Sequence, residues 1–106
     1  MLKDQPTLRD CQDFHIWLDE EKGFSRDLPL NVMLLVEEVG EVAKEVRRIM
    51  HYTADDVLRE YAREHLKEEL ADCLAYIAKL ANYTGIDLEN AYVEKMRYNI
   101  ERVWNE

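Results

Sequence analysis

The sequence predicts an all-α protein, and its composition and periodicity are the observations that predict it. Of the 106 residues only three are glycine and two are proline, and these are the strongest breakers of helices. Apolar residues recur every three or four positions along most of the chain, which is the period of an amphipathic helix. A chain of this length has room for one domain. We therefore expect residues 1–106 to form a single domain, a four-helix bundle-type protomer with a short arm at 1–6.

The first helix is expected to run from about residue 8 to Lys22. Thr7 is a suitable N-cap, and Asp10 three residues later completes a variant of the capping box. Gly23 ends this helix, because glycine readily takes the left-handed conformation of a C-terminal stop. The second helix begins at 27–29, where a proline suits the first helical turn. It is apolar nearly all round in its first half, so we expect it to be central in the bundle.

The second helix is expected to end near Met50, and a short connection follows it. Thr53 with Asp56 repeats the capping pattern, so the third helix is expected over 54–83. Asp87 is a suitable cap for a fourth helix, which continues to about Trp104.

Two pairs of carboxylates define the candidate site. Glu38 with Glu41, and Glu69 with Asp72, are each three residues apart and so share one face of a helix. Beside each pair runs an apolar stripe with the same alternating spacing of four and three, and the pairs lie at matching angles to their stripes. The stripes are Leu35, Val39, Val42, Val46 and Ile49, and Leu66, Leu70, Cys73, Ile77 and Leu80. If the two stripes pack against each other antiparallel, all of these carboxylates converge on one side of the seam.

Carboxylates held this close together need a cation. Two unit charges about 6 Å apart repel by roughly 3 kcal/mol at an effective dielectric constant near 20. Ligands that are all oxygen suit Mg²⁺, or Mn²⁺, rather than zinc or copper, and Mg²⁺ commonly also binds substrate phosphates. Spacing alone leaves a second interpretation equally open, in which the carboxylates form a solvated acidic face.

Composition excludes several other classes of function. The net charge of −9 argues against a nucleic-acid polymer as partner, because phosphate backbones need a basic surface, but it permits a single nucleotide bound through metal ions. No apolar run approaches the ~18 residues of a membrane span, and the N-terminus is no signal peptide, so we expect a cytoplasmic protein. A di-iron bundle would need Glu-x-x-His motifs. The residues three before the histidines are instead Gln12, Arg48 and Ala62.

Further candidates lie outside the carboxylate pairs. Lys95, Asn99 and Arg102 share one face of the fourth helix and are suited to contacting phosphates or a base. Tyr76 lies on the carboxylate side of the third helix, and Phe24 follows the first helix. Either ring could stack on a nucleobase, although core packing is an equal alternative for Tyr76. For the three residues of the fourth helix, the alternative is a charged surface face.

The carboxylate motifs resemble those of a known family. The runs Glu37-Glu38-Val39-Gly40-Glu41 and Glu69-Leu70-Ala71-Asp72 are similar to the Glu-Glu-x-x-Glu … Glu-x-x-Asp pattern of the MazG-like nucleoside triphosphate pyrophosphohydrolases, within the all-α NTP pyrophosphatase superfamily. The Gly85–Glu89 turn and the Lys95-x-x-x-Asn99-x-x-Arg102 pattern extend the likeness over roughly residues 14–102. The resemblance implies an all-α, usually oligomeric Mg²⁺ enzyme that cuts a nucleoside triphosphate between the α- and β-phosphates.

The resemblance also implies roles for individual residues. Mg²⁺ would be bound by Glu38, Glu41, Glu69 and Asp72. Glu37 matches the first Glu of the pattern and would orient or deprotonate the attacking water. Phosphate or sugar would be held by Lys95, Asn99 and Arg102. The base would be contacted by Phe24 and Tyr76.

We therefore expect a housecleaning enzyme that converts a (d)NTP to the (d)NMP and pyrophosphate, and that works as a homodimer or homotetramer. Two alternatives remain. Phosphoribosyl-ATP pyrophosphatase belongs to the same superfamily and has a related carboxylate pattern. A non-catalytic helical interaction module would use the stripes for dimerisation and leave its carboxylates solvated.

Overall fold

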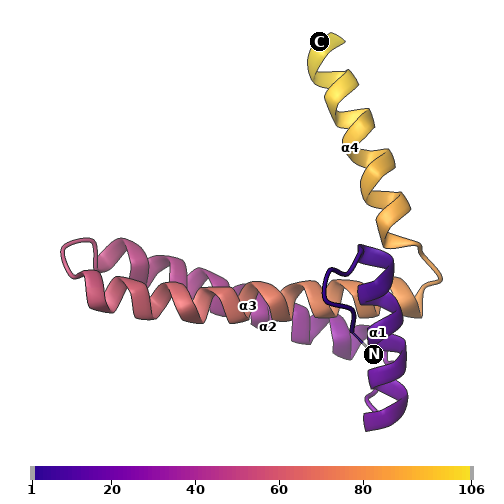
Figure 1. The fold of residues 1–106 in the computed structure, drawn as a ribbon, viewed down its shortest axis with the longest axis horizontal. Coiled ribbons are helices and arrows are strands. Elements are labelled where there is room, and N and C mark those ends of the chain that lie inside the picture. Colours follow the sequence, from indigo (N-terminus) through magenta and orange to yellow (C-terminus); the bar gives the residue numbers. More distant parts are fainter. Residues whose placement is uncertain (1, 106) are drawn as a thin grey trace. The chain divides into compact units, whose positions relative to one another are not determined.

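The computed structural model describes residues 2–105, and this part of the chain contains four α-helices and no strand (Figure 1). The helices are α1 (Leu8–Lys22), α2 (Leu28–His51), α3 (Asp56–Tyr83) and α4 (Leu88–Asn105). The predicted all-α fold is thus confirmed. None of the described helices combines the length and the apolar character needed to cross a bilayer.

The chain divides into two compact units. One comprises residues 25–77, with α2 and most of α3, and the other combines the residues up to Phe24 with those from Ala78 onward. The first of these is a helical hairpin in which α2 and α3 run antiparallel (Figure 1). The hairpin carries the predicted carboxylates, and the second unit carries α1, the end of α3 and α4.

The start of α2 is fixed by its own side chains. Asp27 is the N-cap, and its carboxylate accepts a hydrogen bond of 2.8 Å from the backbone N–H of Leu30. Asn31 is 1% exposed, and its amide donates to the backbone oxygens of Ser25 at 3.0 Å and Asp27 at 2.7 Å. These bonds tie the preceding connection to the first turn of the helix, as the predicted start at 27–29 requires.

The start of α3 differs from the prediction. Thr53 is not the cap, because Asp55 accepts the backbone N–H groups of Val57 and Leu58, both at 3.1 Å. The helix begins at Asp56 rather than at Ala54. The carboxylate of Asp55 is ideally placed to satisfy two free donors of the first turn, whereas the residues before it form a turn.

Only part of each predicted apolar stripe is shielded from solvent. The half-buried members are Leu35, Val42 and Ile49 of α2 and Leu66, Cys73 and Leu80 of α3. Val39 and Val46 are 53% and 41% exposed, and Leu70 and Ile77 are 53% and 40% exposed. The face of α2 that is buried or half-buried is rotated by about one residue, and it carries polar side chains among its apolar ones. This face consists of Asn31, Leu35, Glu38, Val42, Glu45 and Ile49.

As a consequence α2 keeps a second, wholly apolar face that is exposed. Its residues again alternate in steps of four and three, the spacing of a coiled-coil seam. We call this the exposed stripe. It consists of Val32, Val36, Val39, Ala43, Val46 and Met50.

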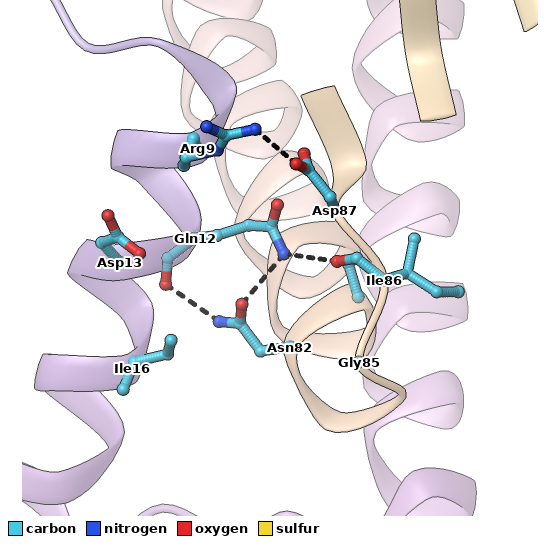
Figure 2. A pocket seen from close by; sticks show the side chains of 9 residues that line it. Arg9, Gln12, Asp13, Ile16, Asn82, Gly85, Ile86 and Asp87 are labelled. Carbon is cyan, nitrogen blue, oxygen red and sulfur yellow. Dashed lines mark hydrogen bonds and ion pairs between the residues drawn. The ribbon is translucent and has the colours of Figure 1, made fainter. Parts of the chain in front are cut away.

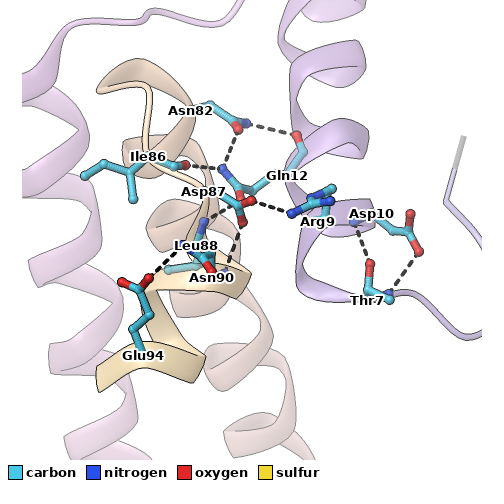
Figure 3. Close-up of polar contacts among 10 residues, drawn as sticks. All are labelled: Thr7, Arg9, Asp10, Gln12, Asn82, Ile86, Asp87, Leu88, Asn90 and Glu94. Carbon is cyan, nitrogen blue, oxygen red and sulfur yellow. Dashed lines mark hydrogen bonds and ion pairs between the residues drawn. The ribbon is translucent and has the colours of Figure 1, made fainter. Parts of the chain in front are cut away.

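The other unit is organised by capping contacts. Thr7 and Asp10 form the predicted capping box of α1, and Gly23 ends the helix in the left-handed conformation with φ 64°. Asp87 accepts the backbone N–H of Asn90 at 3.1 Å, as expected of the cap of α4, and it also pairs with Arg9 of α1 (Figure 3). All three of these predictions are confirmed.

A second, long-range cap comes from Gln12 of α1, which is 7% exposed. Its amide nitrogen donates to Asn82 Oδ1 at 3.0 Å and to the backbone oxygen of Ile86 at 2.9 Å. Its amide oxygen accepts the backbone N–H of Leu88 at 2.8 Å, and Asn82 returns a bond to the backbone oxygen of Gln12 at 2.9 Å. A pocket of about 300 Å³ opens beside these groups (Figure 2), and its amide groups are already bonded to one another.

Candidate metal centre

Three of the predicted carboxylates converge within the hairpin. Glu38 from α2 and Glu69 and Asp72 from α3 each offer an oxygen, and these oxygens all lie within 4.8 Å of one another. We call this group the carboxylate triad. Its two α3 members are three residues apart, so one helical turn presents both to α2. The expected convergence across the antiparallel helices is confirmed for these residues.

Glu41, the fourth predicted ligand, lies outside the triad. Its carboxylate pairs with Lys44 at 3.1 Å, one turn further along the same helix. Its negative charge still acts on the triad, because electrostatic repulsion from Glu41 contributes to the raised pKa of Glu38. The expected role of Glu41 in metal binding stays a prediction.

The pKa of Glu38 is raised within the triad. A side-chain hydrogen bond with Glu69 is the largest cause, and desolvation and the negative charges of Glu69, Asp72 and Glu41 act in the same direction, so that together they raise this pKa from 4.5 to about 7. Neighbouring carboxylates disfavour one another's charged form. A bound cation would offset that repulsion.

Two neutral groups border the triad on α3. Burial raises the pKa of the Cys73 thiol, and the charges of Glu38, Glu69 and Asp72 raise it as well. Tyr76 is affected in the same way, by burial first and then by Glu38 and Asp72. Tyr76 was expected on this side of α3, and its position is confirmed. Cys73 was expected only to pack in the apolar stripe, although its position directly after Asp72 in the chain indicated that it would lie near the triad.

Glu37 sits next to Glu38 in the chain but is exposed. Its negative charge reaches the triad's surroundings, because it contributes to the raised pKa of Tyr76. The structure thus places it on the solvent side of the site. The role expected of it towards water stays a prediction.

A buried acid on the same face of α2 as Glu38 was missed. Glu45 is 2% exposed and pairs through one oxygen with Arg48 at 2.7 Å. Its other oxygen, like Oδ1 of Asn31, is buried and has no hydrogen-bond partner among the described residues. Asn31, Glu38 and Glu45 are spaced by seven, and this heptad of polar residues was the signal that α2 turns a polar face inward.

The remaining predicted residues belong to the other unit. Lys95, Asn99 and Arg102 share one face of α4, as their spacing requires. Lys95 Nζ lies 5.0 Å from the centre of the Tyr98 ring, while Asn99 is half-buried and Arg102 exposed. Phe24 follows Gly23, the left-handed residue that ends α1, and is 48% exposed. Their expected roles in substrate binding stay predictions.

Comparison with known proteins shows similarity to one family. The model of the MazG nucleotide pyrophosphohydrolase domain matches residues 28–104. The chain is 32% identical over 105 residues to dCTP pyrophosphatase 1 of Rattus norvegicus, and 32% identical over 105 residues to dCTP pyrophosphatase 1 of Homo sapiens. These alignments cover 92% of the chain but 59% of each relative. A shorter match, 42% identical over 54 residues, covers 51% of the chain and 46% of the Gene 37 protein of Mycobacterium phage L5.

Proposed function

Because the chain belongs to the MazG nucleotide pyrophosphohydrolase family, we propose that it hydrolyses nucleoside triphosphates with Mg²⁺ bound at the carboxylate triad. The proposed reaction breaks the anhydride between the α- and β-phosphates and yields the (d)NMP and pyrophosphate, in a housecleaning role. The observation that carries the proposal is the convergence of Glu38, Glu69 and Asp72 from two helices.

The donor set of the triad suits this metal. Carboxylate oxygens are the ligands that Mg²⁺ prefers, with Mn²⁺ as the usual substitute. The raised pKa of Glu38 reflects the negative charge gathered around it, and a divalent cation would neutralise that charge. When bound, such an ion neutralises phosphate charge and lowers the pKa of a coordinated water. Glu41, one helical turn from Glu38, is the residue we propose as a further ligand.

The protein's own side chains are proposed to position the reactants. Glu37 is exposed beside Glu38, where a carboxylate can orient the attacking water or accept its proton. Cys73 and Tyr76 have raised pKa values and so remain neutral at pH 7, which avoids adding negative charge beside a triphosphate. Phosphoryl transfer depends mainly on such positioning and charge neutralisation.

The choice of nucleotide is guided by the relatives. The rat and human proteins are named dCTP pyrophosphatase 1, so dCTP is the first substrate we propose. The chain spans 59% of the length of these relatives. A panel of all common dNTPs and NTPs is therefore the appropriate test of specificity.

We also propose that the working form is a homo-oligomer, a dimer or a tetramer. The exposed stripe of α2 supports this, since an uninterrupted apolar face at coiled-coil spacing is suited to another copy of the same helix pair. The small apolar core of the protomer supports assembly too. Among the described apolar residues, the buried ones are Ala62, Ala78 and Ala81, all of them small.

A product analysis tests the proposed function. The purified protein is incubated with the nucleotide panel and with phosphoribosyl-ATP, in Mg²⁺, in Mn²⁺ and in EDTA. Formation of a monophosphate and pyrophosphate that requires metal supports the proposal. Turnover of phosphoribosyl-ATP alone would favour that pyrophosphatase activity instead. No turnover, with a melting temperature indifferent to Mg²⁺ and to nucleotide, would favour a non-catalytic interaction module.

A further inference from the structure

A pocket at the end of α2 brings several basic side chains together. It has a volume of about 230 Å³ and lies wholly within the unit formed by residues 25–77. Its lining consists of Arg47, Arg48, His51 and Tyr52. The chain as a whole carries a net charge of −9, so two adjacent guanidinium groups make this pocket opposite in charge to most of the molecule. The proposed hydrolysis uses none of these residues.

One of the two guanidinium groups is held in place by a buried acid. Glu45 is 2% exposed, and its Oε1 accepts a hydrogen bond of 2.7 Å from Nη1 of Arg48. The other oxygen of Glu45 has no hydrogen-bond partner in the described part of the chain. An arginine has five N–H donors arranged in a planar fork, so the contact at Nη1 fixes Arg48 and leaves donors that can face the pocket.

The other side chains leave the pocket open to a ligand. Arg47 is exposed and has no ion pair or hydrogen bond among residues 2–105. The rings of His51 and Tyr52 meet edge to face, with centroids 5.1 Å apart. The backbone N–H of Tyr52 donates to the oxygen of Arg48 at 2.9 Å, and the oxygen of Tyr52 accepts the N–H of Asp55 at 3.0 Å. Both carbonyl oxygens, which would otherwise repel an anion, are therefore occupied.

Basic residues at the end of a helix also have a simpler role, because they offset the negative end of the helix dipole. That role explains the positive charge, but it requires neither a pocket nor a buried carboxylate, and burying a carboxylate is costly. Guanidinium forks bind phosphate oxygens in pairs. An imidazole and a phenol each add at least one further donor. The lining therefore suits a phosphate group.

We propose that this pocket binds a phosphate group that carries two negative charges. The site is separate from the carboxylate triad, since Arg48 follows Glu38 by ten residues, or ~15 Å along the helix axis at about 1.5 Å per residue. It needs no metal ion, because the lining itself supplies the positive charge. Inorganic phosphate, pyrophosphate and a nucleoside monophosphate all carry such a group, and the experiment separates them.

The test is calorimetric titration of the full chain in EDTA with phosphate, pyrophosphate, dCMP or acetate, the last being a singly charged carboxylate. The principal variant is Arg47→Gln. Its matched control is Arg63→Gln, which changes the net charge equally and removes an exposed arginine of α3 that is paired with Glu60 at 3.5 Å. The second variant combines Glu45→Gln with Arg48→Gln, so the net charge is unchanged and no buried charge is left unpaired.

We expect the wild type to bind at least one of the three phosphate compounds and to bind acetate more weakly than that compound. The dissociation constant should rise roughly 10-fold or more in Arg47→Gln and in the double variant, and it should not change in Arg63→Gln. Glu38→Gln should bind phosphate like the wild type, because the triad takes no part. The compound that binds most tightly identifies the source of the phosphate group.

Three results would overturn the proposal: no binding of any phosphate compound to the wild type, equal binding of acetate, or equal weakening in Arg63→Gln. A role at the helix end alone would also overturn it, and it has its own signature. Arg47→Gln would then lower the melting temperature without ligand and leave phosphate affinity unchanged. Because the titrations exclude metal, a protein that binds phosphate here but hydrolyses no triphosphate refutes the proposed hydrolysis alone.

Discussion

Glu38 was predicted from the sequence to bind metal, lies in the carboxylate triad of the structure, and is central to the proposed chemistry. It lies on the inward face of α2, and a hydrogen bond with Glu69, desolvation and the neighbouring carboxylates together raise its pKa to about 7. A group that is half protonated at neutral pH is poised to exchange its proton for a metal ion. The same repulsion that raises this pKa destabilises the metal-free site once the proton is lost.

The substitution Glu38→Gln should remove the hydrolytic activity without preventing the protein from folding. The amide cannot serve as a charged ligand, so we expect triphosphate hydrolysis to fall below detection while the helices still form. The amide also removes the repulsion with Glu69, so the metal-free variant should melt at a higher temperature than the wild type at pH 8. Turnover and circular dichroism melting test both expectations. Glu64→Gln, an exposed acid of α3 paired with Lys67, is the control, and it should leave both unchanged.

The pH dependence of stability follows from the same carboxyl group. Its pKa is raised from 4.5 to about 7 in the folded protein, so between these values the folded state binds more protons than the unfolded state, and stability falls as pH rises. We expect the melting temperature in EDTA to fall between about pH 5 and pH 8, and the fall to be smaller in Mg²⁺ and in Glu38→Gln. A metal-free melting temperature that rises through this range in the wild type alone would contradict the raised pKa of Glu38.

At the scale of single residues, the sequence predicted the positions that depend on local helical spacing. Glu69 and Asp72 share a face because they are three residues apart, and this needs no tertiary knowledge. Cys73 beside the triad and the buried Glu45 could not be assigned in this way. Their environments depend on which face of α2 turns toward α3, and a rotation by one residue changes every neighbour.

At the scale of helices, capping determines where each helix begins. The cap of α4 comes in part from a side chain of another helix, α1. Gln12 of α1 bonds to Asn82, Ile86 and Leu88 at the end of α3 and the start of α4. These contacts hold the turn that carries Gly85, where φ is 70°. Helix α4, with Lys95, Asn99 and Arg102, is therefore anchored at its first residue by α1.

Gln12→Ala removes these bonds and leaves buried backbone groups without partners. We expect a loss of about 1–3 kcal/mol in the free energy of unfolding, measured by urea denaturation. Gln5→Ala, an exposed glutamine of the N-terminal arm, is the matched control and should change stability by no more than about 0.5 kcal/mol. Equal effects of the two substitutions would show that the Gln12 contacts do not anchor α4.

The helices themselves were predictable because their signals are local. The capping box at Thr7, the glycine stop at Gly23 and the cap at Asp87 all function as the sequence indicated. The start of α3 was misplaced because Thr53 and Asp55 are both acceptable caps, and the choice between them depends on the turn that precedes the helix. The Gln12 contacts span 70 residues or more, which no local pattern reveals.

At the scale of the whole molecule, the exposed stripe of α2 is the feature that the single chain leaves unexplained. The described chain buries few large apolar side chains, while Met50 is 70% exposed and Val36 62% exposed. A protein of this size gains most of its stability from apolar burial. Association through this stripe would supply the burial that the protomer lacks.

Val46→Glu places a charge in the exposed stripe, where Val46 is 41% exposed. We expect size-exclusion chromatography with light scattering to give a dimer or tetramer for the wild type and a smaller species for the variant, with a lower melting temperature. Leu2→Glu, at an apolar residue that is 52% exposed in the N-terminal arm, should keep the wild-type mass. A monomeric wild type at micromolar concentration would contradict the proposed assembly.

The most direct test of the carboxylate triad as a metal centre is calorimetric titration of Mg²⁺ into the nucleotide-free protein near pH 6.5, in buffers of different ionisation enthalpy. If Mg²⁺ replaces the proton that the raised pKa of Glu38 retains near this pH, the wild type binds the ion and releases protons. Glu38→Gln should bind Mg²⁺ more weakly and release fewer. Tight Mg²⁺ binding without proton release, or equal binding by both proteins, would contradict a metal centre at Glu38, Glu69 and Asp72.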